Sequence, residues 1–423
     1  MITANAFRGK RYAVYGLART GKAVIAALVA SGADVVAWDD KPAAREGCAV
    51  PLADLHDANL VGLDALVVSP GVPLRTHPLT QRAAGAGVKI IGDIELFAQA
   101  RTELPSHRVV GITGTNGKST TTALIHHLLQ SAGISARLGG NIGLPIMAQE
   151  PLPAGGVYVL ELSSYQLDLT FSLDCDVAVL LNITPDHLDR HGDMAGYAAA
   201  KARLFAMQSD AHTAVIAAED DYTRAVAASV SAKLVTVAAA DIGAEQADWP
   251  SLQGPHNAQN AAAAIAAVRA LGLTDAQIAA GLASYPGLEH RMERVREMNG
   301  VLFVNDSKAT NPTSTAPALA AYPRIHWIAG GLAKTPELDA CLPQLGNVAA
   351  AYLIGEAMPV FASILKPHVP VIEAGTLDVA TRTAAAAARP GDTVLLSPAC
   401  ASFDQFSDFE ARGRAFVSIV ESL

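Results

Sequence analysis

Cysteine is scarce in this chain: there are four among 423 residues, and no two of them share the C-x-x-C spacing of a zinc or redox site. The pattern therefore predicts neither a cysteine-based metal site nor a disulfide framework, and we expect reduced thiols. The four positions are Cys48, Cys175, Cys341 and Cys400.

Long apolar runs free of charge are also missing. The opening sequence MITANAFRGKRYAVYG has no apolar core followed by a cleavage site, and no later segment approaches the length of a membrane span. We therefore expect a cytoplasmic enzyme without membrane insertion.

Positive charge is in deficit, because the formal net charge is −9. The overall field of such a chain does not attract nucleic acid, so no nucleic-acid partner is expected, and any phosphate ligand must be held by local lysines and helix ends. Hydrophobic residues make up 51% of the chain and charged residues 17%, as in compact globular proteins. We expect two or three domains and a monomer.

Short apolar segments alternate with helical stretches along the whole chain, which is typical of an α/β protein with mostly parallel sheets. Breaks in this pattern near residues 97 and 287 predict three domains, over residues 1–96, 97–287 and 288–423. Helices are predicted over residues 120–129 and 257–271. The predicted strands are 12–15, 34–38, 65–69, 88–91, 109–110, 157–162, 177–183, 302–305, 326–329, 351–354 and 393–397.

The stretch GITGTNGKSTT at 111–121 combines glycines, a lysine and hydroxyls at one strand-to-helix turn. Backbone N–H groups of such a loop face phosphates, the lysine neutralises them, and a hydroxyl can ligate magnesium. Gly111 lies one residue too far from Gly117 for the common spacing, so the motif is a variant, G-x-x-G-K-S-T. We predict a nucleoside triphosphate site rather than a plain glycine turn. Its residues are Gly114, Thr115, Asn116, Gly117, Lys118, Ser119 and Thr120.

A second glycine turn, GLARTG at 16–21, resembles a dinucleotide fingerprint. Asp39 and Asp40 follow the second strand, where a ribose-binding acid would lie. Ala18 replaces the middle glycine, and its Cβ lies where backbone would approach a pyrophosphate, so NAD binding is doubtful. Two glycines that only pack a helix against a strand are an equal alternative. The turn SPGVP at 69–73 could close the same crevice.

Polar side chains also follow the strands of the middle domain. Glu161 ends an apolar strand, where a carboxylate is costly unless it emerges at the carboxyl edge of the sheet, the edge that binds ligands. There it could complete the coordination of a magnesium ion. His187 follows the next strand in NITPDHLD, and Lys201 lies on a short helix after it. A satisfied core histidine and a solvated lysine are the alternatives.

Amides and charges form further clusters later in the chain. Asn257 and Asn260 in HNAQN share one face of a predicted helix start, where amides could match a purine edge or only cap the helix. His290 and Arg291 precede the first strand of the third domain, and NDSKATNP at 305–312 follows it. This cluster suits an anionic ligand, with a polar surface turn as the alternative.

Taken together, these motifs resemble those of the Mur ligase family. The resemblance covers essentially the whole chain in order, and its last motif resembles the branch that adds D-glutamate. It implies a Rossmann-like UDP-binding domain, a central P-loop ATPase domain with a mostly parallel sheet, and a mobile C-terminal Rossmann-like domain. The motifs are GITGTNGKSTT, GGNIGLP around Asn141, LELSSYQL, NITPDHLDRH, YAAAKARLF, HNAQN, EHRMERV, NDSKATNP and LLSPACASFDQFSDFEARG.

The resemblance implies a reaction of peptidoglycan precursor synthesis. ATP would phosphorylate the carboxylate of UDP-N-acetylmuramoyl-L-alanine, and the amine of D-glutamate would attack the acyl phosphate. Two magnesium ions are implied, one at Ser119 and Glu161 and the other at His187 and a carbamylated Lys201. Carbamylation would turn a cation, which cannot be a metal ligand, into an anionic oxygen donor.

The resemblance also implies roles for individual residues. Asn257 and Asn260 would contact adenine, Asp306 the ribose, and Arg291 and Lys308 the phosphates. The UDP-linked substrate would be held by Arg19, Thr20, Asp39, Asp40, Gly71, Asn141 and His187. D-Glutamate would be held by Thr310, Lys334, Ser402 and the backbone of Phe409.

Three other functions remain as alternatives. Folylpolyglutamate synthase shares the phosphate loop and also adds glutamate, but the UDP-type first domain argues against it. An NAD-dependent oxidoreductase would use the turn at 16–21, against which Ala18 counts. A nucleotide-binding regulator without catalysis is the third alternative, but it would give no role to Glu161, His187 and Lys201.

Overall fold

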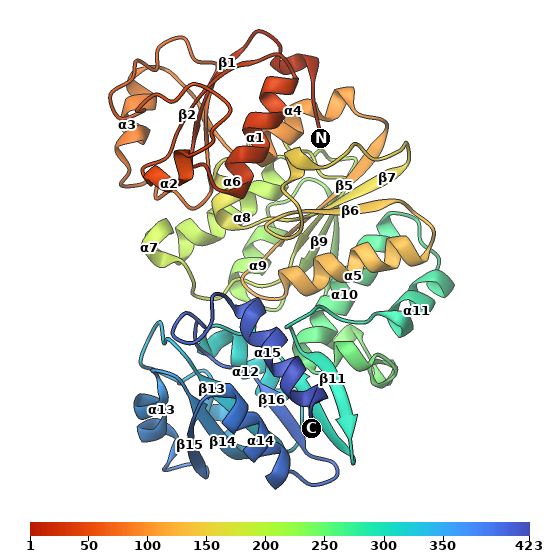
Figure 1. Ribbon diagram of the computed structural model, residues 1–423. Helices are drawn as coiled ribbons and strands as arrows, with labels where there is room; N and C mark the ends of the chain where they lie inside the picture. Colours follow the sequence, from red (N-terminus) through yellow and green to blue (C-terminus); the bar gives the residue numbers. More distant parts are fainter. The chain divides into compact units, whose positions relative to one another are not determined.

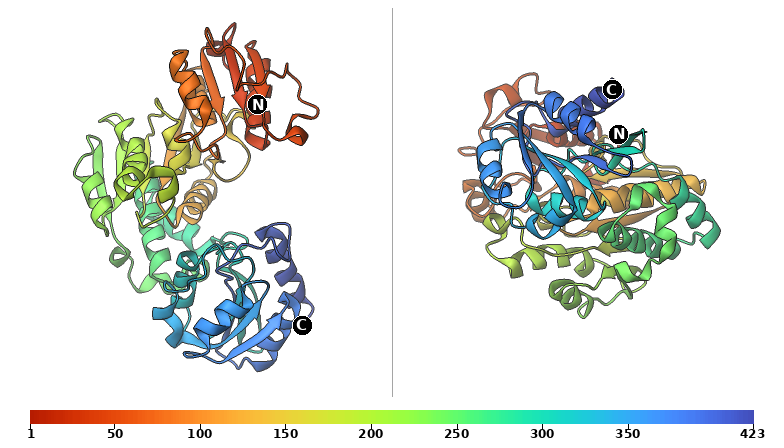
Figure 2. Two further views of the ribbon diagram at one scale, coloured as in Figure 1. Left: turned by 90° about the vertical axis from the view of Figure 1, so that its left-hand side faces the viewer. Right: turned by 90° about the horizontal axis from the view of Figure 1, so that it is seen from below.

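The computed structural model describes all 423 residues, and the chain forms two compact units. The first unit comprises Met1–Ala238 with Asn260–Leu282, and the second comprises Ala239–Gln259 with Ala283–Leu423. Two sheets lie in the first unit and one in the second, each accompanied by helices (Figure 1; Figure 2 shows turned views). No helix combines the length and the apolar character that crossing a membrane requires.

The first sheet has four parallel strands in the order β2-β1-β3-β4. Alternate residues of β1 serve opposite faces: Tyr12 and Val14 pack in a core with α1, and Ala13 and Tyr15 pack in a core with α3. Figure 1 shows these two helices on opposite sides of the sheet. The elements are β1 (Arg11–Tyr15), α1 (Arg19–Ala30), β2 (Asp34–Trp38), α2 (Pro42–Arg45), β3 (Ala65–Val68), α3 (Pro78–Gly85), β4 (Ile90–Ile91) and α4 (Asp93–Ala100).

The second sheet has six parallel strands in the order β10-β9-β8-β5-β7-β6. Its central strands are buried on both faces and carry almost unbroken apolar runs, as parallel strands between helices do. The elements are β5 (His107–Thr113), α5 (Lys118–Ser131), β6 (Ala136–Gly140), β7 (Gly156–Glu161), α6 (Ser164–Asp168), β8 (Val177–Leu180), α7 (Leu188–His191), α8 (Met194–Ala206), β9 (Thr213–Ala217), α9 (Asp221–Ala227), β10 (Lys233–Val237), α10 (Pro255–Ala270) and α11 (Asp275–Ser284).

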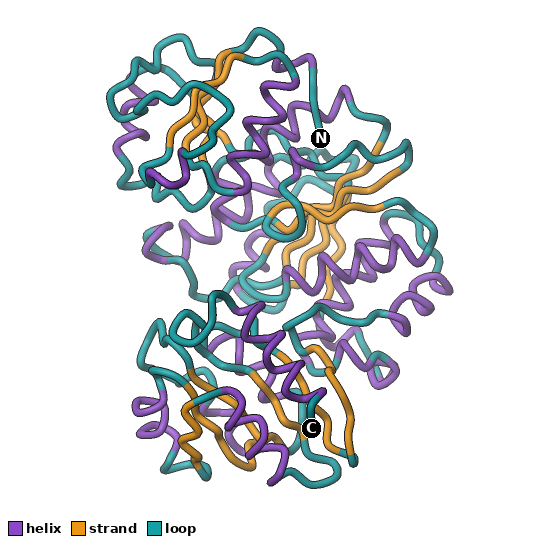
Figure 3. The backbone as a smooth tube through the Cα atoms, in the orientation of Figure 1, coloured by secondary structure: helices purple, strands orange, loops and turns teal.

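The third sheet has six strands in the order β11-β12-β16-β13-β14-β15, and only the edge pair β11–β12 is antiparallel. Trp327 on β13 packs in a core with α12 and α13, while its neighbour Ile328 packs in a core with α14 and α15. Figure 3 shows these strands in orange among the purple helices. The elements are β11 (Glu293–Met298), β12 (Val301–Asn305), α12 (Pro312–Ala320), β13 (Ile325–Gly330), β14 (Val348–Ile354), α13 (Met358–Leu365), β15 (Val371–Gly375), α14 (Leu377–Ala387), β16 (Thr393–Leu396) and α15 (Phe409–Glu421).

Short 3-10 helices complete the chain. They are η1 (Asn5–Phe7), η2 (Arg101–Glu103), η3 (Ile146–Ala148), η4 (Ala239–Asp241), η5 (Ala244–Asp248), η6 (Pro250–Leu252) and η7 (Leu342–Asn347).

A buried polar cluster lies at the amino-terminal edge of the third sheet, away from the edge that binds ligands in such folds. His326 on β13 contacts the hydroxyl of Tyr352 at 3.0 Å and the carboxylate of Asp392 at 3.1 Å. Arg324 lies 2.9 Å from the same carboxylate, which is 3% exposed. Burial acts to raise the pKa of Asp392, but the Arg389 N–H, His326 and Arg324 together hold that pKa below its ordinary value.

We expect this cluster to stabilise the second unit only while Asp392 is ionised. Because the pKa is depressed in the folded chain, the contribution is present above the unfolded value of about 3.9 and is lost as the pH falls through the folded value. Asp392→Asn should lower the free energy of unfolding by about 1–3 kcal/mol at pH 7. Denaturation at pH 7 and pH 3 tests this, because the gap between parent and variant should shrink in acid; a gap that is equal at both values would contradict it.

Candidate active site

The predicted phosphate loop is formed by residues 114–117 between β5, which ends at Thr113, and α5, which begins at Lys118. Gly117 has a φ of 85°, and a Cβ on it would lie 2.1 Å from the Oδ1 atom of Asn260. This position therefore needs glycine. The loop lies beside Asn260, one of the two residues predicted to contact adenine. The loop leads into the first turn of α5, whose N–H groups favour anions. Asn257, one turn before Asn260 on α10, donates to the Gln253 carbonyl at 3.0 Å.

Two lysines converge on one carbonyl of this loop. The Nζ atom of Lys118 lies 2.9 Å from the Gly114 oxygen and 2.7 Å from the Thr115 oxygen. The Nζ atom of Lys201, on α8, lies 2.7 Å from the same Gly114 oxygen, and its side chain is only 1% exposed. Burial, and then the charge of Lys118, lower the pKa of Lys201 well below its ordinary value. The alternative that Lys201 is a solvated lysine is therefore wrong. The helix that carries it, α8, has 13 residues and is longer than the short helix expected.

Glu161 ends β7, the strand beside β5, and is 2% exposed. Its Oε1 atom accepts a hydrogen bond from the Asn141 amide at 3.0 Å, while its buried Oε2 atom has no hydrogen-bond partner. A buried carboxylate oxygen without a donor is costly unless a cation binds it. Glu161 therefore fits a magnesium ligand, with Asn141 fixing its orientation.

His187 follows β8 in a left-handed conformation, with a φ of 52°. Its Nδ1 atom lies 2.8 Å from the Tyr165 hydroxyl, and its side chain is 46% exposed. The alternative of a core histidine is therefore wrong. Burial of part of the ring lowers the pKa of His187 and favours the neutral form that binds metals. Tyr197 links these groups, since its ring lies 4.4 Å from the Lys201 amine and 6.3 Å from the His187 ring.

The glycine turn of the first sheet is shaped by packing. A Cβ on Gly21 would lie 1.9 Å from the Gly16 oxygen, and a Cβ on Gly16 would lie 2.5 Å from the Ser69 hydroxyl. Asp39 accepts the Leu17 N–H at 2.7 Å and the Lys41 N–H at 2.9 Å. Packing is therefore sufficient to explain both glycines, in agreement with the alternative that they only pack a helix against a strand.

The other residues predicted for the UDP-linked substrate follow the strands of the same sheet. Thr20 lies in the first turn of α1, and Arg19 beside it donates to the Gly143 carbonyl at 2.5 Å, in the segment that also contains Asn141. Gly71 follows β3. Asp40 follows β2 and accepts from the Tyr15 hydroxyl at 2.6 Å. The structure therefore gathers Arg19, Thr20, Asp40 and Gly71 at the carboxyl edge of the first sheet.

The second unit presents its own charged cluster. Arg291 lies between His290 and Met292, whose φ angles of 62° and 49° are left-handed, and its buried Nε atom has no hydrogen-bond partner. Asp306 after β12 accepts from the Ser397 hydroxyl at 2.7 Å, and burial raises its pKa to about 6. Strained backbone beside an unpaired guanidinium nitrogen is typical of a ligand site. The Lys308 amine lies 5.6 Å from the centre of the Phe409 ring.

The four residues predicted to bind D-glutamate follow neighbouring strands of the third sheet. Thr310 follows β12, the exposed Lys334 follows β13, Ser402 follows β16, and Phe409 begins α15. Ser402 is 2% exposed and caps no helix, because the N-cap of α15 is Asp408. The Phe409 N–H lies in the first turn of α15, a position that suits a carboxylate.

Arg412 is a residue of this cluster that the sequence did not indicate. It lies on α15 and is 1% exposed. Its guanidinium donates to the Ser307 hydroxyl at 3.0 Å and to the carbonyls of Ser307, Cys400 and Ala401 at 2.9, 3.0 and 3.3 Å. It thereby joins the segment of Asp306 and Lys308 to the segment of Ser402. Nothing in FEARG distinguishes such an arginine from an exposed helical one.

The comparisons with protein families cover most of the chain. Residues 10–92 match the Mur ligase MurD-like N-terminal domain. Residues 112–268 match the Mur ligase middle domain, and residues 290–400 match the Mur ligase glutamate ligase domain. The predicted α/β fold of three domains is thereby confirmed. The boundaries predicted at 96/97 and 287/288 stay predictions.

Curated relatives match over the full chain. One is the UDP-N-acetylmuramoylalanine–D-glutamate ligase of Novosphingobium aromaticivorans, 60% identical over 430 residues, covering 100% of this chain and 97% of the relative. A protein of the same name from Caulobacter vibrioides is 46% identical over 461 residues, covering 100% of this chain and 98% of the relative.

Solved structures show the same fold at low identity. MurF from Acinetobacter baumannii aligns with a TM-score of 0.60 at 18% identity, covering 98% of this chain and 92% of that one. MurC from Thermotoga maritima aligns with a TM-score of 0.58 at 18% identity, covering 98% and 99%. The full-length relatives and the three matching domains confirm the predicted resemblance and the predicted class of enzyme, an ATP-dependent ligase. The chain belongs to the Mur ligase family.

Proposed function

We propose that this chain joins D-glutamate to UDP-N-acetylmuramoyl-L-alanine at the expense of ATP, in the synthesis of peptidoglycan precursors. One observation carries the ATP-dependent step: two amines, those of Lys118 and Lys201, meet at the carbonyl of Gly114 in a glycine loop at a helix N-terminus. Such a concentration of N–H donors beside the positive charge of Lys118 is stable next to a polyphosphate and costly without an anion.

The reaction proceeds in two displacements. A carboxylate oxygen of the L-alanine residue bonds to the γ-phosphorus, the bond from that phosphorus to the bridging oxygen breaks, and ADP leaves. The amine of D-glutamate then bonds to the carbonyl carbon, the carbon–oxygen bond to the phosphate breaks, and the nitrogen loses a proton. Lys118 and the loop N–H groups stabilise the charge on the transferring phosphoryl group.

Magnesium, when bound, would neutralise the phosphate oxygens and align them for displacement. We assign one ion to Ser119 and Glu161, because the buried Oε2 atom of Glu161 lacks a partner. We assign a second ion to His187 and Lys201. Tyr165 then keeps the His187 ring in place through its contact with Nδ1.

The second assignment requires a carbamate on Lys201. The lowered pKa of this buried amine favours its neutral, nucleophilic form. Its nitrogen would bond to the carbon of CO₂ and lose a proton, which leaves an anionic oxygen as a metal ligand. The carbamate would also place a negative charge beside the cationic amine of Lys118, which would attract it.

The remaining predicted contacts are part of the same proposal. ATP would be held by the phosphate loop, by Asn257 and Asn260 at adenine, and by Asp306, Arg291 and Lys308. The carboxyl edge of the first sheet would hold the UDP portion, and Thr310, Lys334, Ser402 and the Phe409 N–H would hold D-glutamate. We further propose a cytoplasmic monomer whose domains close around the substrates.

The direct test of this function is ADP release by the purified protein with UDP-N-acetylmuramoyl-L-alanine and a panel of D- and L-amino acids. We expect release that requires the UDP-linked substrate and is fastest with D-glutamate. Release that is as fast with D-alanine or with L-glutamate would contradict the proposed substrate.

We expect Ser402→Ala to weaken D-glutamate binding selectively. Two carboxylates must each find donors in a closed site, and loss of a hydroxyl bond to one of them costs roughly 1.5–3 kcal/mol. The apparent KM for D-glutamate should rise about tenfold or more, with KM for ATP and the UDP-linked substrate nearly constant. Ser363→Ala, at an exposed serine of α13, is the matched control. An unchanged KM for D-glutamate in Ser402→Ala would remove this residue from the site.

A further inference from the structure

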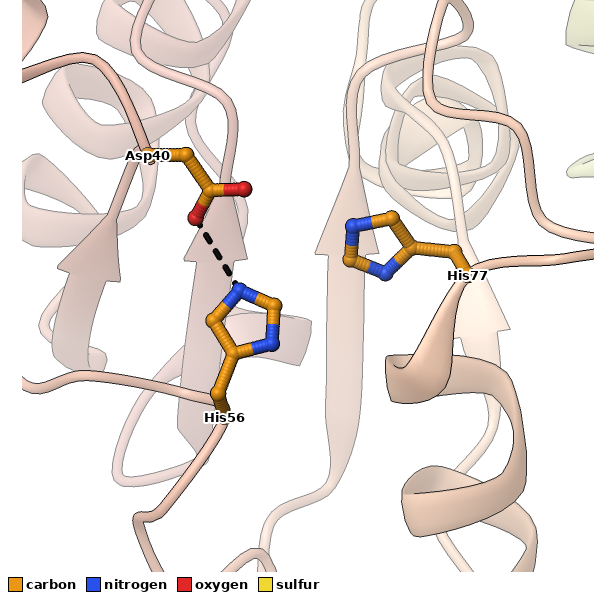
Figure 4. A group of neighbouring side chains, drawn as sticks. All are labelled: Asp40, His56 and His77. Atoms are coloured by element: carbon orange, nitrogen blue, oxygen red, sulfur yellow. Dashed lines mark hydrogen bonds and ion pairs between the residues drawn. The ribbon is translucent and has the colours of Figure 1, made fainter.

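Four polar side chains meet at the carboxyl edge of the first sheet. Tyr15 ends β1, Asp40 follows β2, and His77 caps α3 at its N-terminus. His56 comes from the segment between α2 and β3. Figure 4 shows His56 directed at the Asp40 carboxylate and His77 facing the pair from the other side. Of the four, the sequence singled out only Asp40.

The hydrogen bonds of this cluster run in one direction. The Leu79 N–H donates to the Nδ1 atom of His77 at 3.4 Å, so the proton of the neutral ring lies on Nε2. That N–H donates to the Tyr15 hydroxyl at 3.0 Å, and the hydroxyl donates to the Oδ2 atom of Asp40 at 2.6 Å. The Nε2 atom of His56 lies 3.0 Å from the Oδ1 atom of Asp40 and donates to it. Both carboxylate oxygens are thus held by donors.

The charge states agree with this direction. The hydrogen bond from Tyr15 lowers the pKa of Asp40, while burial raises the pKa of Tyr15 and lowers that of His77. The network therefore combines an ionised carboxylate, a protonated phenol and a neutral imidazole at neutral pH.

Asp40, His56 and His77 could also suggest a metal site, since their ligand atoms all lie within 4.8 Å of one another. A histidine that binds a metal through Nε2 carries its proton on Nδ1 and donates it to an acceptor. The Nδ1 atom of His77 faces a backbone donor instead. The geometry therefore favours a hydrogen-bonded network over a metal centre.

We propose that Tyr15, His56 and His77 are positioning residues that hold Asp40 as the hydrogen-bond acceptor for the uridine moiety of the UDP-linked substrate. The inference rests on the proposed function, in which Asp40 contacts the UDP portion. The Asp40 side chain is 57% exposed, so its remaining lone pairs are accessible to a ligand. A carboxylate accepts N–H or O–H donors, and the two uridine donors considered are the base N3–H and the ribose 2′-hydroxyl.

Tyr15→Phe tests the network because it removes one hydroxyl and keeps a ring that is 5% exposed in the parent. The affinity for UDP, measured by calorimetry without ATP or D-glutamate, should fall about tenfold, as expected for loss of a bond to a charged acceptor. In turnover, KM for the UDP-linked substrate should rise by a similar factor with little change in kcat or in KM for ATP. Tyr12→Phe, on the same strand and also buried, is the matched control and should bind UDP as the parent does.

Two further nucleotides identify the donor. CDP lacks the N3–H, and 2′-deoxy-UDP lacks one ribose hydroxyl. If Asp40 accepts from the base, the parent should bind UDP more tightly than CDP, and Tyr15→Phe should lose that preference. The ratio of the affinities for UDP and 2′-deoxy-UDP should then be the same in parent and variant. If Asp40 accepts from the ribose 2′-hydroxyl, the parent should bind UDP more tightly than 2′-deoxy-UDP, and Tyr15→Phe should lose that preference instead.

Three outcomes would overturn the inference: UDP affinity unchanged in Tyr15→Phe, an equal loss for all three nucleotides, or a Zn²⁺ ion whose removal from the parent abolishes UDP binding. The proposed function fails separately. A parent that binds UDP with this discrimination and yet releases no ADP with the full substrates would contradict the reaction and leave the network intact.

Discussion

Lys118→Ala should reduce turnover by about 10³-fold or more, the typical loss when a group that clamps a transferring phosphoryl is removed. The loop that carries it should keep its shape, because that shape depends on Gly117, whose φ is 85° and beside which Asn260 leaves no room for a Cβ. The lysine supplies charge and caps the carbonyls of Gly114 and Thr115. Rates of ADP release at saturating substrates measure the loss.

Lys233→Ala is the matched control, since it removes the same charge from the exposed strand β10 of the same unit. It should retain the parent rate, and circular dichroism should be the same for all three proteins. Near-normal ADP release by a folded Lys118→Ala protein would show that residues 114–120 do not form the ATP site.

Lys201→Ala should lose about 10²-fold or more of the activity, because a ligand oxygen and the charge balance around Lys118 are lost together. The amine is buried against the Gly114 carbonyl, so the variant leaves a small space at the place where the carbamate would lie. Acetate or another small carboxylate should enter that space and partly restore turnover. The rescue should depend on the concentration of the carboxylate.

Lys201→Arg separates a charge requirement from a carbamate. A guanidinium stays cationic and cannot become an anionic ligand, so this variant should be as inactive as Lys201→Ala and should not respond to acetate. Full activity in Lys201→Arg, or an unmodified amine found by mass spectrometry in active protein, would contradict the carbamate.

Much of the fold could be predicted because buried parallel strands leave apolar runs in the sequence. The predicted strand at 34–38 coincides with β2, and those at 12–15 and 302–305 differ from β1 and β12 by one residue. The edge strands β6, β10, β11 and β15 were not predicted. Glu293–Met298, for example, alternates exposed charges with half-buried residues, because β11 is antiparallel and covered on one face only. The central strand β9 was also missed, within an alanine-rich stretch that reads equally as helix.

The candidate site was predictable where chemistry is local. The glycines, Lys118 and the hydroxyls of the phosphate loop are contiguous, and Glu161 stood out as a carboxylate at the end of an apolar strand. Contacts between distant segments leave no such trace. The meeting of Lys201 with Gly114, the carbonyls around Arg412, and the network that holds Asp40 depend on the tertiary fold.

Isotope transfer tests the central claim most directly, because it follows the oxygen that should become bonded to phosphorus. UDP-N-acetylmuramoyl-L-alanine labelled with ¹⁸O at both carboxylate oxygens would be converted with ATP and D-glutamate, and the released inorganic phosphate analysed by mass spectrometry. The account predicts one labelled oxygen in each phosphate, since the carbon–oxygen bond breaks when the amine attacks. Phosphate without label, formed alongside the amide product, would contradict the acyl phosphate.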